Sequence, residues 1–169
     1  MQARVKWVEG LTFLGESASG HQVLMDGNAG DKAPSPMEMV LMSVGGCSAI
    51  DVVSILQKGR HDVRDCEVKL TSERREEAPR VFTHINLHFI VSGKGLGDKA
   101  VERAVDLSAD KYCSVALMLG KAASVTHSFE VREVPNGMWR GGLILPAPVR
   151  CRLATQSFCL PAAAAPAVP

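Results

Sequence analysis

The chain has 169 residues, of which 46% are hydrophobic and 22% are charged, and its formal net charge is +1. These values predict one soluble domain with a hydrophobic core of its own. The near-neutral charge, without a basic stripe or arm, argues against a nucleic-acid-binding protein. The first ten residues, MQARVKWVEG, lack the apolar core of a signal peptide, so we expect a cytoplasmic protein.

The N-terminal section predicts three short strands. Polar and apolar residues alternate over residues 3–9, 11–16 and 21–26, and glycine-containing turns separate the three stretches. Strands joined by such short turns usually pair with their neighbours in the chain. We therefore expect a small antiparallel meander.

A long apolar helix is predicted over residues 36–58. Ser35 suits the N-cap, the proline after it suits the first helical position, and Glu38 completes a capping box. Gly59 should end the helix. Its length and composition would also fit a membrane span, but two glycines, several serines and the charge of Asp51 lie inside it. These residues favour a buried core helix, so we expect no membrane partner.

The second half of the domain predicts a hairpin, two helices and a last strand. The hairpin starts near residue 63 and turns at residues 78–79. The first helix covers residues 98–107, and the second begins near residues 108–111 and covers residues 112–121. A strand over residues 125–134 completes the order βββ-α-ββ-αα-β. Strands and helices that are segregated in this way indicate the α+β class.

The composition changes after residue 134. Six of the nine prolines lie between residues 135 and 169, and the chain ends in PAAAAPAVP. Such a low-complexity segment cannot bury enough apolar surface to form a core. We expect a domain over residues 1–134 and a poorly ordered, Pro/Ala-rich appendage over residues 135–169.

The five cysteines are widely spaced: Cys47, Cys66, Cys113, Cys151 and Cys159. Their odd number argues against a secreted disulfide scaffold, and the absence of a CxxC pair argues against a structural zinc site. His84 and His88 lie about 13 Å apart on one strand, too far to share a metal ion. We therefore expect neither a bound metal nor a bound cofactor.

Cys47 stands directly after two glycines in the long helix. A glycine costs about 1 kcal/mol relative to alanine in a helix interior, and it lets another backbone or a ligand come close. Asp51 lies one turn further on the same face and could fix a water or a partner. The alternative is that Cys47 is a small core residue and Asp51 an ordinary polar position in a packing seam.

Cys113 is the second candidate thiol. It falls in the first turn of a predicted helix, where free backbone N–H groups favour a thiolate. Two helical cysteines in different environments suggest a dithiol pair, in which one is oxidised to sulfenic acid and the other condenses with it. Packing beside apolar neighbours is the alternative, and the spacing cannot show that the two cysteines meet.

A cysteine hydrolase is a further alternative. It would need a histidine near Cys47, for which His21 is the only loose candidate. Cys66 is expected in the core.

The segments SPMEMVLMSVGGCSAIDVVSIL and SADKYCSVALML resemble the two cysteine motifs of the OsmC/Ohr family. This family comprises the osmotically inducible protein C and organic hydroperoxide resistance proteins, and the likeness is to its small YhfA-like branch. The resemblance covers residues 1–134. The resemblance implies an intertwined homodimer with the long helices buried at its centre and the sites at the subunit interface.

The resemblance also implies a thiol-dependent peroxidase that acts in the oxidative stress response. Cys47 would attack an organic or inorganic hydroperoxide, and Cys113 would resolve the sulfenic acid to a disulfide. An external dithiol, lipoyl-type in some members, would then reduce that disulfide. No bound cofactor is implied.

The sequence departs from the family at the group that activates the thiol. Family peroxidases use an arginine held by a glutamate directly after the helix-starting proline. Here Met37 has that place, Glu38 lies one residue later, and residues 15–20 contain no arginine. Glu38, His21 and Arg60 are the available substitutes. The competing interpretation is a non-enzymatic OsmC-like protein that holds a small apolar ligand at the dimer interface.

Overall fold

The N-terminal meander is present as predicted. The computed structural model describes residues 1–28 and 30–134, and the expected appendage lies outside these residues. Strands β1 (Ala3–Glu9), β2 (Thr12–Ser17) and β3 (Gln22–Asp26) form an antiparallel sheet in that order. Their bounds agree with the predicted ones to within one residue.

One face of this N-terminal sheet is apolar and open. Trp7 pairs with Phe13 across β1 and β2, so the two side chains share a face. Val5, on the same face of β1, and Trp7 expose 61% and 62% of their surface. The apolar side that the alternation predicted is therefore not covered by any other described part of the chain.

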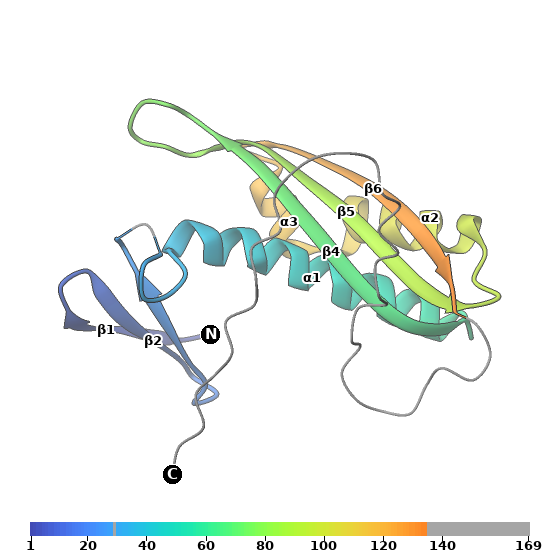
Figure 1. Cartoon of the computed structure of the whole chain (residues 1–169), viewed down its shortest axis with the longest axis horizontal. Helices are drawn as coiled ribbons and strands as arrows, with labels where there is room; N and C mark the ends of the chain where they lie inside the picture. The colour runs from blue at the N-terminus through green and yellow to red at the C-terminus, as the bar shows by residue number, and fades with distance from the viewer. Residues whose placement is uncertain (29, 135–169) are drawn as a thin grey trace, which may run out of the picture. The chain divides into compact units, whose positions relative to one another are not determined.

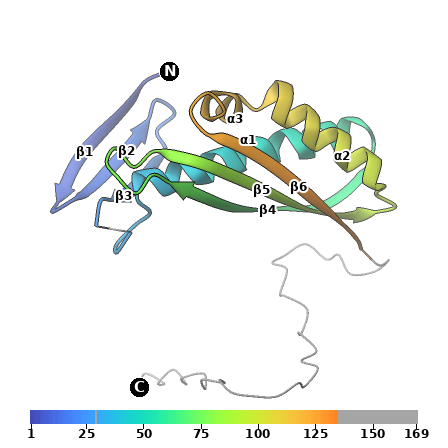
Figure 2. The ribbon, with the colours of Figure 1, turned by 90° about the horizontal axis from the view of Figure 1, so that it is seen from above.

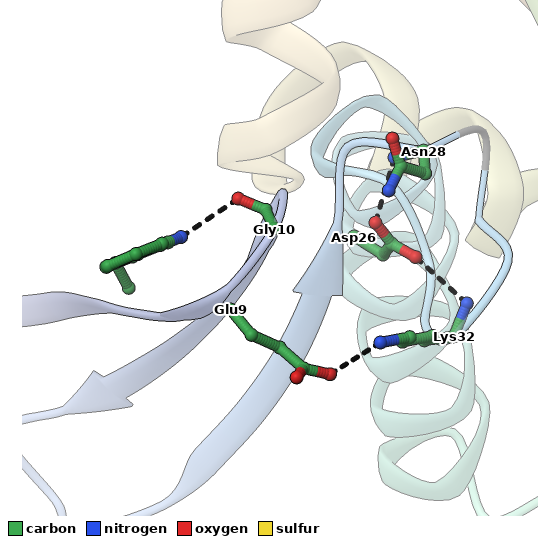
Figure 3. A network of polar contacts seen from close by, with 6 residues as sticks. Glu9, Gly10, Asp26, Asn28 and Lys32 are labelled. Carbon is green, nitrogen blue, oxygen red and sulfur yellow. Dashed lines mark hydrogen bonds and ion pairs between the residues drawn. The ribbon is translucent and has the colours of Figure 1, made fainter.

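A buried carboxylate organises the loop after β3. Asp26 is 1% exposed, and its two oxygens accept hydrogen bonds from the backbone N–H groups of Asn28 (2.8 Å) and Lys32 (2.9 Å), as Figure 3 shows. These bonds hold the pKa of Asp26 below its usual range. The Lys32 ammonium forms an ion pair with Glu9 of β1. The loop that leads from the sheet to the long helix is thus tied back to the sheet.

Helix α1 (Pro36–Lys58) begins and ends where the sequence predicts. The Ser35 hydroxyl accepts from the Glu38 N–H at 3.3 Å, and the Glu38 carboxylate accepts from the Ser35 N–H at 2.7 Å, which completes the capping box. Gly59 is the C-cap residue. The predicted helix signals are confirmed.

The second sheet carries the core. Strands β4 (Asp62–Arg74), β5 (Phe82–Lys94) and β6 (Ser124–Glu133) lie in the order β4-β5-β6. The first two form the predicted antiparallel hairpin, whereas β6 runs parallel to β5. A parallel pair needs a crossover that carries the chain back along the sheet.

Helical segments make up this crossover, and they differ from the prediction in one respect. Helix α2 (Asp98–Leu107) is present as predicted, but the second predicted helix is divided into a π-helical turn η1 (Ser108–Tyr112) and α3 (Ser114–Leu119). In Figures 1 and 2 the helices α1, α2 and α3 cover one face of the β4-β5-β6 sheet. The α+β order βββ-α-ββ-αα-β is confirmed.

The core lies between this sheet and the helices. Alternate residues of β5 and residues of α1 and α2 share one cluster and are at most 2% exposed: Ile85, Leu87, Phe89, Val91, Val44, Val52, Leu56, Val101 and Val105. Cys66 of β4 packs against this cluster while half-buried. Burial raises the pKa of its thiol to about 11.

The two glycines before Cys47 have different surroundings. A Cβ at Gly45 would lie 2.6 Å from Cδ1 of Leu70, so this glycine lets α1 approach β4 closely. Outside its own helical turn, a Cβ at Gly46 would meet no atom of the described residues within 4 Å. Gly46 lies between Met42 (46% exposed) and Ile50 (71% exposed) on the same open side of α1. By length and composition alone α1 could also cross a membrane, but its other side is packed into the core.

Candidate thiol site

Two sulfurs and a carboxylate meet at the middle of α1. The Sγ atoms of Cys47 and Cys113 and a carboxylate oxygen of Asp51 all lie within 4.8 Å of one another. Cys47 and Asp51 are four residues apart and share a face of α1, and Cys113 arrives from the crossover between β5 and β6. The structure therefore brings together three of the residues that the sequence singled out.

The π-helical turn determines where the Cys113 side chain lies. The Cys113 N–H donates to the Ser108 carbonyl at 2.8 Å, which closes the wider turn. Cys113 itself is extended and serves as the N-cap of α3, whereas the sequence predicted it inside the first helical turn. Its sulfur accepts a hydrogen bond from the Ala116 N–H at 3.4 Å. A free N–H of a helix start thus contacts the thiol, as the sequence suggested.

Two buried serines complete the site, and the sequence analysis did not identify either. The Ser48 hydroxyl donates to Cys113 Sγ at 3.1 Å, and the Ser108 hydroxyl lies 3.3 Å from an Asp51 oxygen and 3.4 Å from the Ser48 carbonyl. Ser48 is 2% exposed and Ser108 0%. A serine in an apolar helix normally bonds to the preceding helical turn. A serine in each of the two cysteine motifs was therefore the available signal that the site contains further polar groups.

The two sulfurs lie in different environments. Burial raises the pKa of Cys113, and the neighbouring Cys47 raises it further, while the hydrogen bonds from Ser48 and Ala116 act in the opposite direction. Cys113 is 0% exposed, whereas Cys47 is half-buried. A molecule that approaches from solvent therefore meets Cys47 first. Among residues 1–28 and 30–134, no Lys, Arg or His side chain donates a hydrogen bond to either sulfur.

The other candidates make local contacts elsewhere. Glu38 lies nine residues before Cys47, about 13 Å along the helix axis, and its hydrogen bonds to Ser35 lower its pKa. His21 lies between β2 and β3, with its Nδ1 3.0 Å from the Ser19 hydroxyl. Arg60 follows the end of α1 in a left-handed conformation, with φ at 60°. A contribution of Glu38 or His21 to the thiol chemistry stays a prediction.

A family model described as "OsmC-like protein" matches residues 29–128, which include all three residues of the cluster. The chain belongs to the OsmC family. An OsmC-family relative, "Protein YhfA" of Escherichia coli K12, is 86% identical over 131 residues, which are 78% of this chain and 98% of the relative. The predicted family and branch are confirmed.

Solved OsmC-like structures share the fold. A hypothetical protein from Aquifex aeolicus VF5 is 32% identical, with a TM-score of 0.72 over 79% of this chain and 97% of its own. The organic hydroperoxide resistance protein OhrB of Bacillus subtilis is 14% identical, with a TM-score of 0.54 over 77% of this chain and 98% of its own. At that identity the likeness shows the fold alone.

Proposed function

We propose that this protein is a thiol-dependent peroxidase that reduces hydroperoxides through Cys47 and Cys113. Membership of the OsmC family suggests a role in peroxide resistance. The observation that supports the specific reaction is the pair of sulfurs within 4.8 Å, one half-buried and one fully buried. A buried partner thiol next to an accessible one is what a two-cysteine reduction needs.

The roles of the two cysteines follow from their exposure. The Cys47 thiolate attacks the outer oxygen of ROOH, the O–O bond breaks, and the products are Cys47 sulfenic acid and ROH. The Cys113 sulfur then attacks the Cys47 sulfur and water leaves, so that a disulfide forms. To bond, the sulfurs must close from within 4.8 Å to about 2 Å. An external dithiol, of lipoyl type by analogy with the family, then reduces this bond to two thiols and is itself oxidised to a disulfide.

The test uses one equivalent of cumene hydroperoxide on reduced, metal-free protein, followed by mass-mapped alkylation. We expect rapid formation of a Cys47–Cys113 bond. Cys113→Ser should instead accumulate Cys47 sulfenic acid, which dimedone traps, and Cys47→Ser should not consume peroxide. Cys66→Ser is the matched control, because Cys66 lies on β4 outside the cluster, and it should behave as wild type.

Slow oxidation spread over all five cysteines would contradict the peroxidase. It would favour the second candidate, a non-enzymatic protein that binds a small apolar ligand. One observation supports that candidate: in the described part of the chain, the groups that donate hydrogen bonds to the sulfurs are uncharged. A ligand retained in native mass spectra, without peroxide turnover, would then be expected.

We also propose that the protein is a homodimer. The open side of α1 and the open apolar face of the N-terminal sheet both lack cover within the described chain, and exposed apolar surface of this extent marks an interface. A second copy is the partner that the family resemblance implies. Ile50→Asp should give monomers in sedimentation experiments, whereas Lys58→Asp, at the exposed end of α1, should leave dimers.

We propose the cytoplasm as the compartment. Family membership supports a soluble protein. The cytoplasm keeps thiols reduced, and the proposed reaction starts from the reduced thiols of Cys47 and Cys113. Cell fractionation with thiol trapping would test this, and recovery with the membrane fraction or in the periplasm would contradict it.

A further inference from the structure

We propose that Cys47, Asp51 and Cys113 form a binding site for a thiophilic divalent cation, for which Zn²⁺ fits best. The inference concerns the reduced protein and does not depend on peroxide chemistry. Each of the three residues offers one ligand atom, and these atoms lie within 4.8 Å of one another. In a tetrahedral site with Zn–S near 2.3 Å and Zn–O near 2.0–2.2 Å, ligand atoms are roughly 3.5–4 Å apart. Only a small closure separates the cluster from that geometry.

Hydrogen bonds already orient two of the three ligands. The Ser48 hydroxyl (3.1 Å) and the Ala116 N–H (3.4 Å) donate to Cys113 Sγ. The Ser108 hydroxyl lies 3.3 Å from an Asp51 oxygen. Such donors behind the ligands fix their orientation and increase the affinity of metal sites. The cluster is thus supported by a second layer of buried polar groups.

The charge of the site calls for a cation. Asp51 is half-buried and takes part in none of the ion pairs formed by the described residues. The N–H and O–H groups that contact the sulfurs carry no net charge. A divalent ion would supply the positive charge that none of these contacts provides. It would also lower the cost of holding a carboxylate and two thiolates close together.

The donor set selects the kind of metal. Two thiolates and one carboxylate suit Zn²⁺, whereas Mg²⁺ and Ca²⁺ require oxygen ligands. Three protein ligands leave a fourth tetrahedral position for water, which is the arrangement of an open zinc site. The sequence did not predict the site because its ligands come from two distant segments without a CxxC spacing.

Metal binding and disulfide formation exclude each other, because both use the same two sulfurs. A bound Zn²⁺ would therefore protect Cys47 and Cys113 from oxidation and alkylation. The remaining thiols would keep their reactivity. This gives the proposal a readout that is independent of activity.

The test titrates the full-length, reduced, metal-free chain with Co²⁺ and then displaces Co²⁺ with Zn²⁺. We expect one Co²⁺ per chain, the thiolate-to-cobalt charge-transfer absorption, and loss of that absorption when Zn²⁺ is added. Asp51→Asn keeps the size of the side chain and should weaken binding about tenfold or more, and Ser108→Ala should weaken it by about 10–100-fold. Cys47→Ser and Cys113→Ser should abolish the absorption.

Matched controls remove residues of the same types outside the cluster. Cys66→Ser and Asp110→Asn should bind as wild type, and so should the double variant Cys151→Ser, Cys159→Ser. Wild-type affinity in Asp51→Asn, or loss of binding in any control, would overturn the proposal. A chain that forms the Cys47–Cys113 disulfide with peroxide but binds no Co²⁺ would refute the metal site and leave the peroxidase intact.

Discussion

The Ser48 hydroxyl donates a 3.1 Å hydrogen bond to the sulfur of Cys113, and both groups are buried. This bond opposes the rise in the pKa of Cys113 that burial causes. Ser48→Ala should therefore raise the pKa of Cys113 and slow its attack on a Cys47 sulfenic acid. One pKa unit lowers the thiolate fraction about tenfold, and because the more basic thiolate is the better nucleophile, the net rate falls about threefold. Rapid-quench trapping of the sulfenic acid would measure this.

Ser43 provides the control for this substitution. It lies on α1 one turn before Cys47, and its hydroxyl donates to the Met39 carbonyl. Ser43→Ala should leave the resolving step unchanged. Equal rates in Ser48→Ala and Ser43→Ala would show that the hydrogen bond to Cys113 does not affect its reactivity.

The two adjacent glycines should respond differently to alanine. Gly45→Ala places a Cβ 2.6 Å from a Leu70 methyl group, and overpacking of this kind costs typically 1–3 kcal/mol. The added Cβ of Gly46→Ala meets no atom within 4 Å in the described residues beyond its own helical turn, and the change should gain helix propensity. The free energy of unfolding, measured with urea, should be about 1–3 kcal/mol lower for Gly45→Ala than for Gly46→Ala. The reverse order would mean that β4 moves away freely or that Gly46 is closely packed in the assembled protein.

Cys66 should react slowly with alkylating agents in the folded domain. Its pKa of about 11, against an ordinary value of 9.0 for a thiol, reduces the thiolate fraction near pH 8 about a hundredfold. Alkylation with iodoacetamide at pH 8, read by mass spectrometry, should therefore be about 100-fold slower at Cys66 in the folded chain than in the urea-unfolded chain. Equal rates in the two states would contradict the burial of this thiol.

Acid should weaken the loop that Asp26 organises. The folded pKa of Asp26 lies below the ordinary carboxyl value of 3.8. Its contribution to stability is therefore present above pH 3.8 and is lost as the pH falls through the lower folded value. Asp26→Asn should make the free energy of unfolding less dependent on pH below about 4. Asp31→Asn, an exposed change in the same loop, should keep the wild-type dependence. Identical acid profiles for wild type and Asp26→Asn would rule out this linkage.

Removal of residues 135–169 should leave the domain functional. The matched family region ends at residue 128, and the last described strand ends at Glu133. A chain that stops at Val134 should keep its unfolding midpoint, its association state and its thiol reaction. Circular dichroism, sedimentation and mass-mapped alkylation would check these in turn. A truncated chain that fails to fold would refute the predicted domain boundary.

The sequence predicted the elements of the fold because each has a local cause. The capping box at Ser35 and Glu38 set the start of α1, and the alternation of polar and apolar residues indicated the three N-terminal strands. The parallel pairing of β5 with β6 has no local cause, because it depends on how the crossover packs. The division of the second predicted helix depends on one wide turn closed between Ser108 and Cys113, which residue periodicity does not encode.

The site was predictable in its residues and not in its contacts. Cys47 and Cys113 stood out by their glycines and by their place near a helix start, but only the fold brings their sulfurs within 4.8 Å. The bonds made by Ser48 and Ser108 join α1 to the crossover, so each needs a partner about 60 positions away. A short polar residue in an apolar helix indicates that it has a polar partner, but it does not indicate where in the chain that partner lies.

The position of Cys113 on the return path between two parallel strands has a further consequence for oxidised protein. A bond to Cys47 would close a loop of about 66 residues, and in the chain-entropy model such a link stabilises a folded protein by about 4 kcal/mol. The link would reduce the number of conformations that the unfolded chain can adopt. The oxidised form should therefore resist unfolding and proteolysis more than the reduced form. Exposure to peroxide would then lengthen the lifetime of the protein in the cell, and reduction would make it easier to degrade.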